Sequence, residues 1–339
     1  MNKSTITTSE SSISRVILVL LAYNQRDYVG DAVASLFAQD YPNLHIVLSD
    51  DASTDDTFAC LKQAAADYAG PHHVTLNQTS GGGGLLAHLY SAIEGVDGAL
   101  VVGAAGDDVS SPERVSKLVK AWQGTGAAGI YSGWNCVDQN LNFLRREGNE
   151  QQHVRDMATY FPNREVVIAR GATAAYAMPF LRSFVLPRVP IWAEDYFLSG
   201  VAMFQGRNIL YLDEPLVSYR QNEAALRNFN SLKLDFFSYE KREQSFFAEF
   251  LVLHNALKNI MRSYPGVKQE VNFEAIERDL KWYRYRANWP EQSMLRRLAF
   301  TLRLFDRTKL RWAVPRVIGI DRFIYIKSHF LRRNIPISS

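Results

Sequence analysis

The sequence predicts an α/β fold built on a mostly parallel, doubly wound sheet with a C-terminal helical extension. Through about residue 125, apolar segments of strand length alternate with amphipathic helical segments, as in folds with a parallel sheet. Acidic pairs follow two of these strands, where ligand-binding loops begin in open α/β sheets. From about residue 230 the apolar spacing becomes helical.

In the first half of the sequence, predicted strands and helices alternate regularly. Its expected strands are residues 15–23, 44–50, 72–78 and 98–105, and its expected helices are 29–39, 53–69, a segment after the glycine run, and 110–122. Ser111 is placed to cap the last of these helices, with Pro112 as its first residue. Farther along, 129–138 and 208–220 are typical of strands, and 194–205, 232–261 and 271–289 of helices.

Composition indicates an ordinary intracellular globular protein. The chain has 339 residues, of which 47% are hydrophobic and 22% charged. Its two cysteines, Cys60 and Cys136, offer neither a disulfide framework nor metal-ligand spacing, which favours a reducing compartment. No apolar run reaches the 18 residues expected of a membrane-spanning helix. We therefore expect a cytoplasmic protein.

The net charge of +3 hides an asymmetry. Residues 281–339 carry 14 Lys and Arg against 3 Asp and Glu, a local charge of +11, which leaves −8 on the first 280 residues. Residues 293–312 have the spacing of a basic amphipathic helix, which favours an anionic membrane surface. The alternative is that these helices pack on the catalytic domain. Nucleic acid is disfavoured, because no recognised binding motif accompanies the charge.

Two pairs of neighbouring aspartates close predicted strands. Asp50 and Asp51 end the second strand, and Asp107 and Asp108 end the fourth. Because like charges repel, each pair needs a compensating partner or exposure to solvent. Mg²⁺ and similar hard cations are held by one or two carboxylates together with substrate phosphates. A cation site is therefore predicted; turns and helix caps are the alternative explanation.

Two further segments contain candidate catalytic or binding residues. Glu194 and Asp195 open a predicted helix, where an acidic neighbour and apolar surroundings raise a carboxyl pKa toward that of a general base. An acidic helix cap is the alternative. Arg220 is a candidate for bidentate phosphate binding, or else a surface arginine beside a strand. The glycines at 81–84 lack the remaining residues of known phosphate loops and predict a flexible loop.

Several of these segments together resemble a known family. "VILVLLAYNQRDYVGDAVASLFAQDYPNLHIVLSDDASTDDT" and "GDDVSSPERV" resemble the family 2 glycosyltransferases of GT-A fold, the second segment being similar to their metal-binding DxD element. "IWAEDYFLSG" resembles the family's Glu-Asp element, and "PLVSYRQNEAALRN" a segment of bacterial polysaccharide and O-antigen transferases. The chain departs from the family at Ala22, usually Thr or Ser, and at Asn222, usually His.

The resemblance implies roles for individual residues. Asp51 would accept a hydrogen bond from the base, and Asp107 would approach the ribose or the sugar. Asp195 would be the general base, with Glu194 as its neighbour or as an acceptor contact. The full set that the resemblance implies is Ala22, Tyr23, Asp51, Asp107 and Arg220 for the nucleotide sugar, Asp108 for Mn²⁺ or Mg²⁺, and Asp195 with Glu194 for catalysis.

The implied activity is a metal-dependent, inverting transfer of a hexosyl group from a nucleoside-diphosphate sugar to a glycan acceptor in bacterial surface polysaccharide synthesis. UDP or dTDP is the favoured carrier, with GDP open. A polyprenyl-diphosphate-linked acceptor would place the enzyme peripherally on the cytoplasmic face of the inner membrane. A nucleotidyltransferase and a non-catalytic membrane scaffold with a degenerate transferase domain are the alternatives.

The expected domain organisation follows the same divisions. Residues 1–14 form a disordered tail, and residues 15–228 a GT-A catalytic domain. Within it, 15–125 would bind the nucleotide and 126–228 the acceptor. Residues 229–339 form a basic helical region.

Overall fold

The computed structural model describes residues 14–147, 169–221, 236–263 and 271–288. The chain divides into two compact units, one of Met1–Phe229 with Val252–Glu277 and one of Asn230–Leu251 with Arg278–Ser339. The predicted disordered tail, apart from residue 14, and the predicted basic helix at 293–312 lie outside the described residues.

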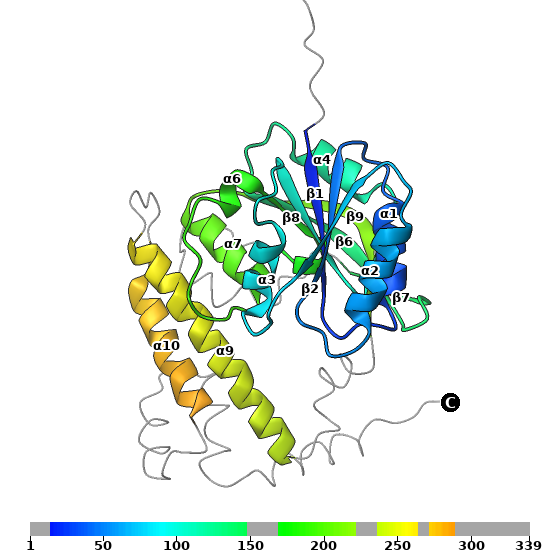
Figure 1. The fold of residues 1–339 in the computed structure, drawn as a ribbon. Coiled ribbons are helices and arrows are strands. Elements are labelled where there is room, and N and C mark those ends of the chain that lie inside the picture. Colours follow the sequence, from blue (N-terminus) through cyan, green and yellow to red (C-terminus); the bar gives the residue numbers. More distant parts are fainter. Residues whose placement is uncertain (1–13, 148–168, 222–235, 264–270, 289–339) are drawn as a thin grey trace, which may run out of the picture. The chain divides into compact units, whose positions relative to one another are not determined.

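The strands of the first unit form one nine-stranded sheet in the part of the chain that is described (Figure 1). Eight strands follow the order β3-β2-β1-β4-β8-β6-β9-β5, and the ninth, β7, pairs with β6 off this path. Its first half is parallel, as predicted, because each crossover returns through a helix. These strands are β1 (Val16–Ala22), β2 (Leu44–Asp50), β3 (His73–Gln78) and β4 (Leu100–Ala105).

The second half of the sheet is mixed, which the sequence pattern did not predict. The strands are β5 (Val109–Ser110), β6 (Gly129–Val137), β7 (Phe143–Glu147), β8 (Ala174–Ala177) and β9 (Ile209–Arg220). β8 runs antiparallel to both β4 and β6, whereas β6 and β9 are parallel. β8 has only four residues, all buried, so it shows no alternation of apolar and polar residues that would mark it as a strand.

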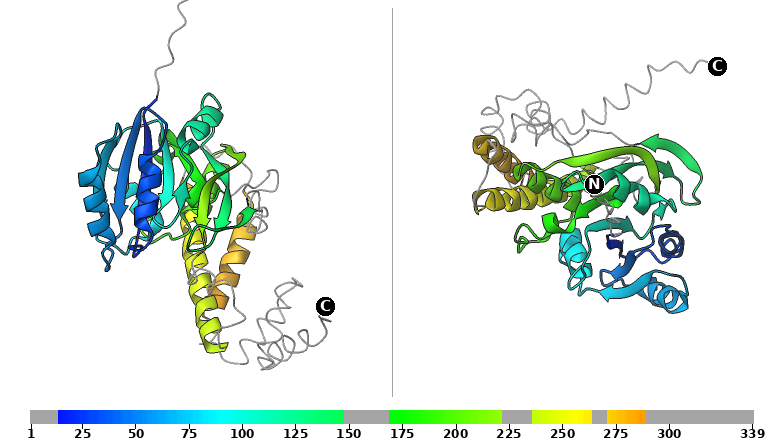
Figure 2. Two further views of the ribbon diagram at one scale, coloured as in Figure 1. Left: turned by 90° about the vertical axis from the view of Figure 1, so that its right-hand side faces the viewer. Right: turned by 90° about the horizontal axis from the view of Figure 1, so that it is seen from above.

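Helices cover both faces of the parallel half. They are α1 (Val29–Phe37), α2 (Thr57–Asp67), α3 (Gly84–Ala92) and α4 (Arg114–Trp122). Alternate residues of β1, β2 and β4 form one core cluster with the apolar faces of α1, α2 and α4. α3 lies on the other side of the sheet from α1 and α2 (Figures 1 and 2). The layered arrangement confirms the predicted α/β class.

The predicted start of α4 is wrong by a few residues. The helix begins at Arg114, and Glu113 rather than Ser111 occupies the cap position. The N–H of Ser111 donates to the carbonyl oxygen of Leu216 at 2.9 Å, which ties this segment to β9. Long-range pairing with a strand therefore overrides the local capping preference.

Three of the remaining helices, α7, α9 and α10, match predicted segments, whereas the short η1 and α6 were not predicted. A one-turn 3₁₀-helix η1 (Gly171–Thr173) precedes β8, and α6 (Met178–Leu181) and α7 (Glu194–Phe204) follow it. The long helices α9 (Phe236–Ser263) and α10 (Phe273–Ala287) confirm the helical C-terminal pattern. No described helix has the length and apolarity needed to cross a membrane.

Candidate active site

The carboxyl ends of β1, β2 and β4 meet at one edge of the sheet. The N–H of Asp51 donates to the carbonyl oxygen of Ala22 at 2.9 Å, which joins the ends of β1 and β2. A Cβ atom at position 106 would lie 2.9 Å from the Cβ of Ala22, so only glycine permits this approach of the β4 loop to β1. Ala22 is 1% exposed, while the adjacent Tyr23 is 56% exposed.

The two carboxylates of the first acidic pair have different surroundings. Asp50 is fully buried and accepts hydrogen bonds from the Ser53 N–H at 2.9 Å and from Gln78 Nε2 at 3.1 Å. It therefore shapes the turn after β2. Asp51, the predicted base contact, is partly exposed, and one of its carboxylate oxygens accepts the Thr79 hydroxyl. The contribution of Thr79 was not predicted from the sequence, because no motif marks it.

The second acidic pair lies between β4 and β5. Asp108 is 5% exposed, and its Oδ1 accepts the backbone N–H of Arg220 at 2.8 Å. Its Oδ2 is buried and has no hydrogen-bond partner among the described residues. Burial and, next, the charge of Asp107 raise the pKa of Asp108 to about 8. Burying a carboxylate oxygen without a compensating partner costs free energy. A cation or a proton at this atom would therefore stabilise the folded protein.

Asp107 lies beside it in a partly exposed position. Burial raises the pKa of its carboxyl, while the charge of Arg220 and a hydrogen bond from the Gln25 side chain oppose the shift. Within the described residues no three Asp, Glu, His or Cys side chains gather as a metal site. Paired carboxylates with one free buried oxygen nevertheless fit a hard cation that takes its other ligands from phosphate and water.

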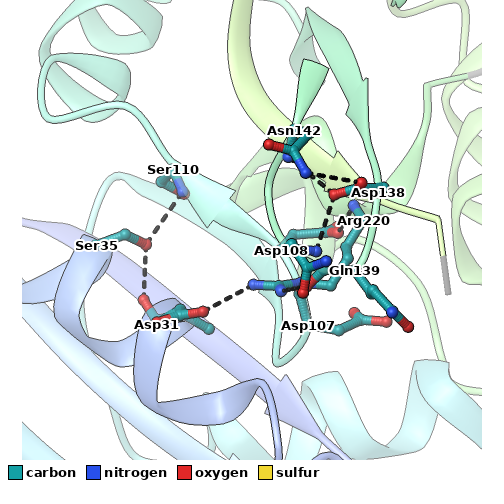
Figure 3. A network of polar contacts seen from close by, with 11 residues as sticks. Asp31, Ser35, Asp107, Asp108, Ser110, Asp138, Gln139, Asn142 and Arg220 are labelled. Atoms are coloured by element: carbon teal, nitrogen blue, oxygen red, sulfur yellow. Dashed lines mark hydrogen bonds and ion pairs between the residues drawn. The ribbon is translucent and has the colours of Figure 1, made fainter. Parts of the chain in front are cut away.

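Arg220 is buried and braces the acidic loop (Figure 3). Its Nε donates to the Asp107 carbonyl oxygen at 2.8 Å, and its second terminal nitrogen lies 3.0 Å from Asp31 Oδ2 on α1. It also donates to the Gln139 carbonyl oxygen and lies over the Tyr28 ring at 4.7 Å. These contacts commit much of the guanidinium to the protein itself. The geometry therefore favours a structural role over the predicted phosphate contact.

The third acidic pair begins α7, as predicted. Asp195 accepts the Gly171 N–H at 3.1 Å through Oδ2 and the Tyr196 N–H at 2.7 Å through Oδ1. Burial raises the pKa of Asp195, while these hydrogen bonds and the Arg170 charge oppose the shift. Burial and the Asp195 charge raise the pKa of Glu194 well above its ordinary value. A buried carboxyl pair of this kind has the raised basicity expected of a general base.

A cavity of about 80 Å³ lies between this pair and the end of β4. Its lining includes Gly103 and Ala105 of β4, Gly171 of η1, Tyr176 of β8 and Glu194 of α7. The cavity therefore joins the edge that carries the aspartates to the start of α7. Sequence spacing did not reveal this juxtaposition, because η1 and β8 were not predicted.

A buried arginine holds these elements together. Arg114 is 0% exposed, and its side chain donates to the Gly103 carbonyl oxygen at 2.7 Å, the Ala172 carbonyl oxygen at 3.0 Å and the Ser110 hydroxyl at 2.9 Å. Burial lowers the pKa of Arg114 to about 10, and the nearby Asp108 opposes that shift. Arg114 thus links β4, η1 and α4. It was not predicted, because the pattern assigns a charged residue at a helix start to solvent.

Comparison with known proteins shows which family this chain resembles. Residues 17–183 match the model for glycosyl transferase family 2. EpsE of Bacillus subtilis (strain 168), named as a glycosyltransferase, is 32% identical over 105 residues, or 31% of this chain and 37% of EpsE. TuaG of the same organism, named as a teichuronic acid biosynthesis glycosyltransferase, is 24% identical over 242 residues, or 68% of this chain and 90% of TuaG.

A solved structure supports the fold. The mannosyltransferase PcManGT from Pyrobaculum calidifontis, solved in complex with GDP-Man and Mn²⁺, superposes with a TM-score of 0.50 at 16% identity, covering 90% of this chain and 84% of that one. At this identity the likeness concerns the fold, which is the predicted GT-A arrangement of a mostly parallel sheet with helices. Residues 17–183 therefore form a glycosyltransferase family 2 domain, and the chain is a glycosyltransferase.

Proposed function

We propose that this enzyme transfers a sugar from a nucleoside-diphosphate sugar to a glycan acceptor in bacterial surface polysaccharide synthesis, with inversion at the anomeric carbon. The name of TuaG supports the pathway class, and the GDP-Man bound to PcManGT supports the class of donor. The nucleotide is UDP, dTDP or GDP. The acceptor is a lipid-linked glycan, which agrees with the strongly basic C-terminal sequence.

The observation that carries the proposal is the buried Oδ2 of Asp108, which has no hydrogen-bond partner among the described residues and lies at the edge where β1, β2 and β4 end. Asp108, with Asp107 beside it, would hold Mn²⁺ or Mg²⁺. That cation would supply charge neutralisation for the departing nucleoside diphosphate. The Mn²⁺ in the PcManGT complex supports this assignment.

The remaining roles belong to the chain's own side chains. Asp51 accepts a hydrogen bond from the base, while Ala22 positions Asp51 through its carbonyl oxygen and the exposed Tyr23 contacts the nucleotide. Asp195 removes the proton from the acceptor hydroxyl as it attacks the anomeric carbon. Its two backbone hydrogen bonds fix the carboxylate in place. Glu194, in the wall of the cavity, contacts the acceptor or the transferred sugar.

Two substitutions test these roles. Asp108→Ala removes the cation ligand, so Mn²⁺ should no longer increase the thermal stabilisation given by a nucleotide sugar. Asp195→Asn removes the base, so transfer should fall by about two to four orders of magnitude while stabilisation by donor and Mn²⁺ persists. The measurements are a thermal-shift screen of UDP-, dTDP- and GDP-sugars with and without Mn²⁺, and a turnover assay on the active pair.

The products separate this proposal from its alternatives. Release of a nucleoside diphosphate supports glycosyl transfer, whereas release of pyrophosphate would indicate a nucleotidyltransferase. Donor binding that depends on Mn²⁺, without turnover on any acceptor of a broad panel, would favour a scaffold. Near-normal turnover by Asp195→Asn would refute the assignment of the base.

A further inference from the structure

Arg170 is held next to the candidate base by backbone hydrogen bonds on both sides. The N–H of the preceding Ala169 donates to Ser199 Oγ of α7 at 3.1 Å. The N–H of the following Gly171 donates to Asp195 Oδ2 at 3.1 Å. Two contacts to the same helix therefore fix the position of Arg170 relative to Asp195.

The side chain of Arg170 lies against two aromatic rings. Its guanidinium carbon is 4.9 Å from the centroid of the Trp134 ring on β6 and 5.8 Å from that of the Tyr219 ring on β9. Stacking on ring faces orients a guanidinium while leaving its N–H groups free to donate at the edges. Arg170 is exposed, and no carboxylate among the described residues forms an ion pair with it.

The charge of Arg170 affects the pKa of the candidate base and that of Tyr219, which lies near the predicted cation site. It opposes the rise in the pKa of Asp195 and that in the pKa of Tyr219. Burial and, next, the charges of Asp108 and Asp107 raise the pKa of Tyr219 to about 12. Arg170 is therefore within electrostatic reach of Asp195, and Tyr219, on which it stacks, is within reach of Asp107 and Asp108.

We propose that Arg170, with Trp134 and Tyr219, forms a subsite that binds a phosphate group of the acceptor. An oriented guanidinium without a carboxylate partner matches the paired oxygens of a phosphate. The donor diphosphate belongs at Asp108, and the hydrogen bond from Gly171 to Asp195 places Arg170 beside the group that activates the acceptor. The assignment to the acceptor rests on the proposed function. A lipid-linked diphosphate supplies such a group.

Binding of an inorganic probe tests the subsite without any need for turnover. The full chain, freed of metal with EDTA, is titrated with inorganic pyrophosphate while tryptophan fluorescence is recorded, because Trp134 stacks on Arg170. Arg170→Gln should weaken pyrophosphate binding roughly tenfold or more by removing the charged donor. Trp134→Phe should remove most of the fluorescence change, which assigns the signal to this subsite.

Arg182→Gln is the matched control. Arg182 is also exposed, but it pairs with Asp97 at 2.9 Å, just before β4 and therefore at the opposite edge of the sheet. This variant loses the same charge and should bind pyrophosphate as the wild type does. Equal weakening in both variants would show a general charge effect and would refute the subsite, as would unchanged binding in Arg170→Gln.

A second titration tests whether the subsite binds the acceptor or the donor. UDP and GDP, each with Mn²⁺, are titrated into the wild type and Arg170→Gln. Unchanged nucleotide affinity supports the acceptor assignment, whereas a loss of roughly tenfold would assign Arg170 to the donor diphosphate and overturn it. If neither nucleotide binds either variant while pyrophosphate binding still depends on Arg170, the proposed donor fails but the anion subsite stands.

Discussion

At the scale of single residues, Glu194 combines a candidate catalytic role with a cost to stability. Burial and Asp195 raise its pKa in the folded protein well above the ordinary value that it has in the unfolded chain. The stabilising contribution of such a carboxyl is complete below its unfolded-state pKa and is lost as pH rises through its folded-state pKa. The folded protein therefore loses stability as this buried group becomes ionised.

Glu194→Gln should remove this loss of stability at high pH, because a glutamine side chain does not ionise. The melting temperature of the variant minus that of the wild type should increase steadily from about pH 5 to about pH 8.5. Differential scanning fluorimetry in a series of buffers measures this difference. Glu113→Gln is the control. A backbone hydrogen bond and, next, the partner Lys117 lower the pKa of Glu113, so the melting-temperature difference for this variant should stay flat over this range. A flat difference for Glu194→Gln as well would contradict the assignment of a raised pKa.

At the scale of elements, the start of α3 fixes the segment that leads to α7. Gly84 has φ +77°, and a Cβ atom there would lie 2.7 Å from both the backbone nitrogen and the carbonyl oxygen of Ile191. The N–H of Leu86 also donates to the Ile191 carbonyl oxygen at 3.1 Å. The glycine run was expected to be a flexible loop, but Gly84 packs against the backbone of Ile191, three residues before Glu194.

Gly84→Ala should therefore destabilise the protein and displace the acidic pair. We expect a loss of about 2–4 kcal/mol in the free energy of unfolding, from the clash together with the left-handed backbone. Gly82→Ala is the matched control. Gly82 has φ +79°, but no atom of the described residues lies within 4 Å of an added Cβ, so only the backbone cost of about 1 kcal/mol applies. Urea unfolding of both variants measures the difference, and equal losses would contradict a packing role for Gly84.

At the scale of the whole molecule, charge is distributed so that the C-terminal sequence is strongly basic while the rest is acidic. Arg296, Arg297, Arg303 and Arg307 lie in this basic sequence, outside the described residues. Replacing all four with glutamine in the full chain should remove about 1 kcal/mol of membrane attraction per charge at low ionic strength.

Co-sedimentation with phosphatidylglycerol-containing and pure phosphatidylcholine vesicles measures the effect. The wild type should bind the anionic vesicles, and its binding should weaken as salt increases. The glutamine variant should bind the anionic vesicles much more weakly than the wild type does. Equal sedimentation of the wild type with neutral and anionic vesicles would refute electrostatic membrane attachment.

Local pattern predicted much of the fold and the location of the acidic residues. Strands β1 to β4 were predicted because apolar residues in runs of strand length are a local signal, and the acids after β2 and β4 followed from the chain order. β8 was missed because its four buried residues carry no periodicity. The brace that Arg220 forms was also missed, since its partners on α1 and in the loops after β4 and β6 are remote in sequence.

The sequence by itself determined the α/β class, the family and the acidic pairs, because strand periodicity and short motifs are properties of neighbouring residues. Only the tertiary structure decided which oxygen of Asp108 lacks a partner within the described part of the chain, and that Arg170 stacks on Trp134 and Tyr219. Those features arise from the insertion of antiparallel β8 between β4 and β6 and from the pairing of β5 with β9. Such pairings join residues far apart in the chain, and their free energy depends on packing that no local pattern records.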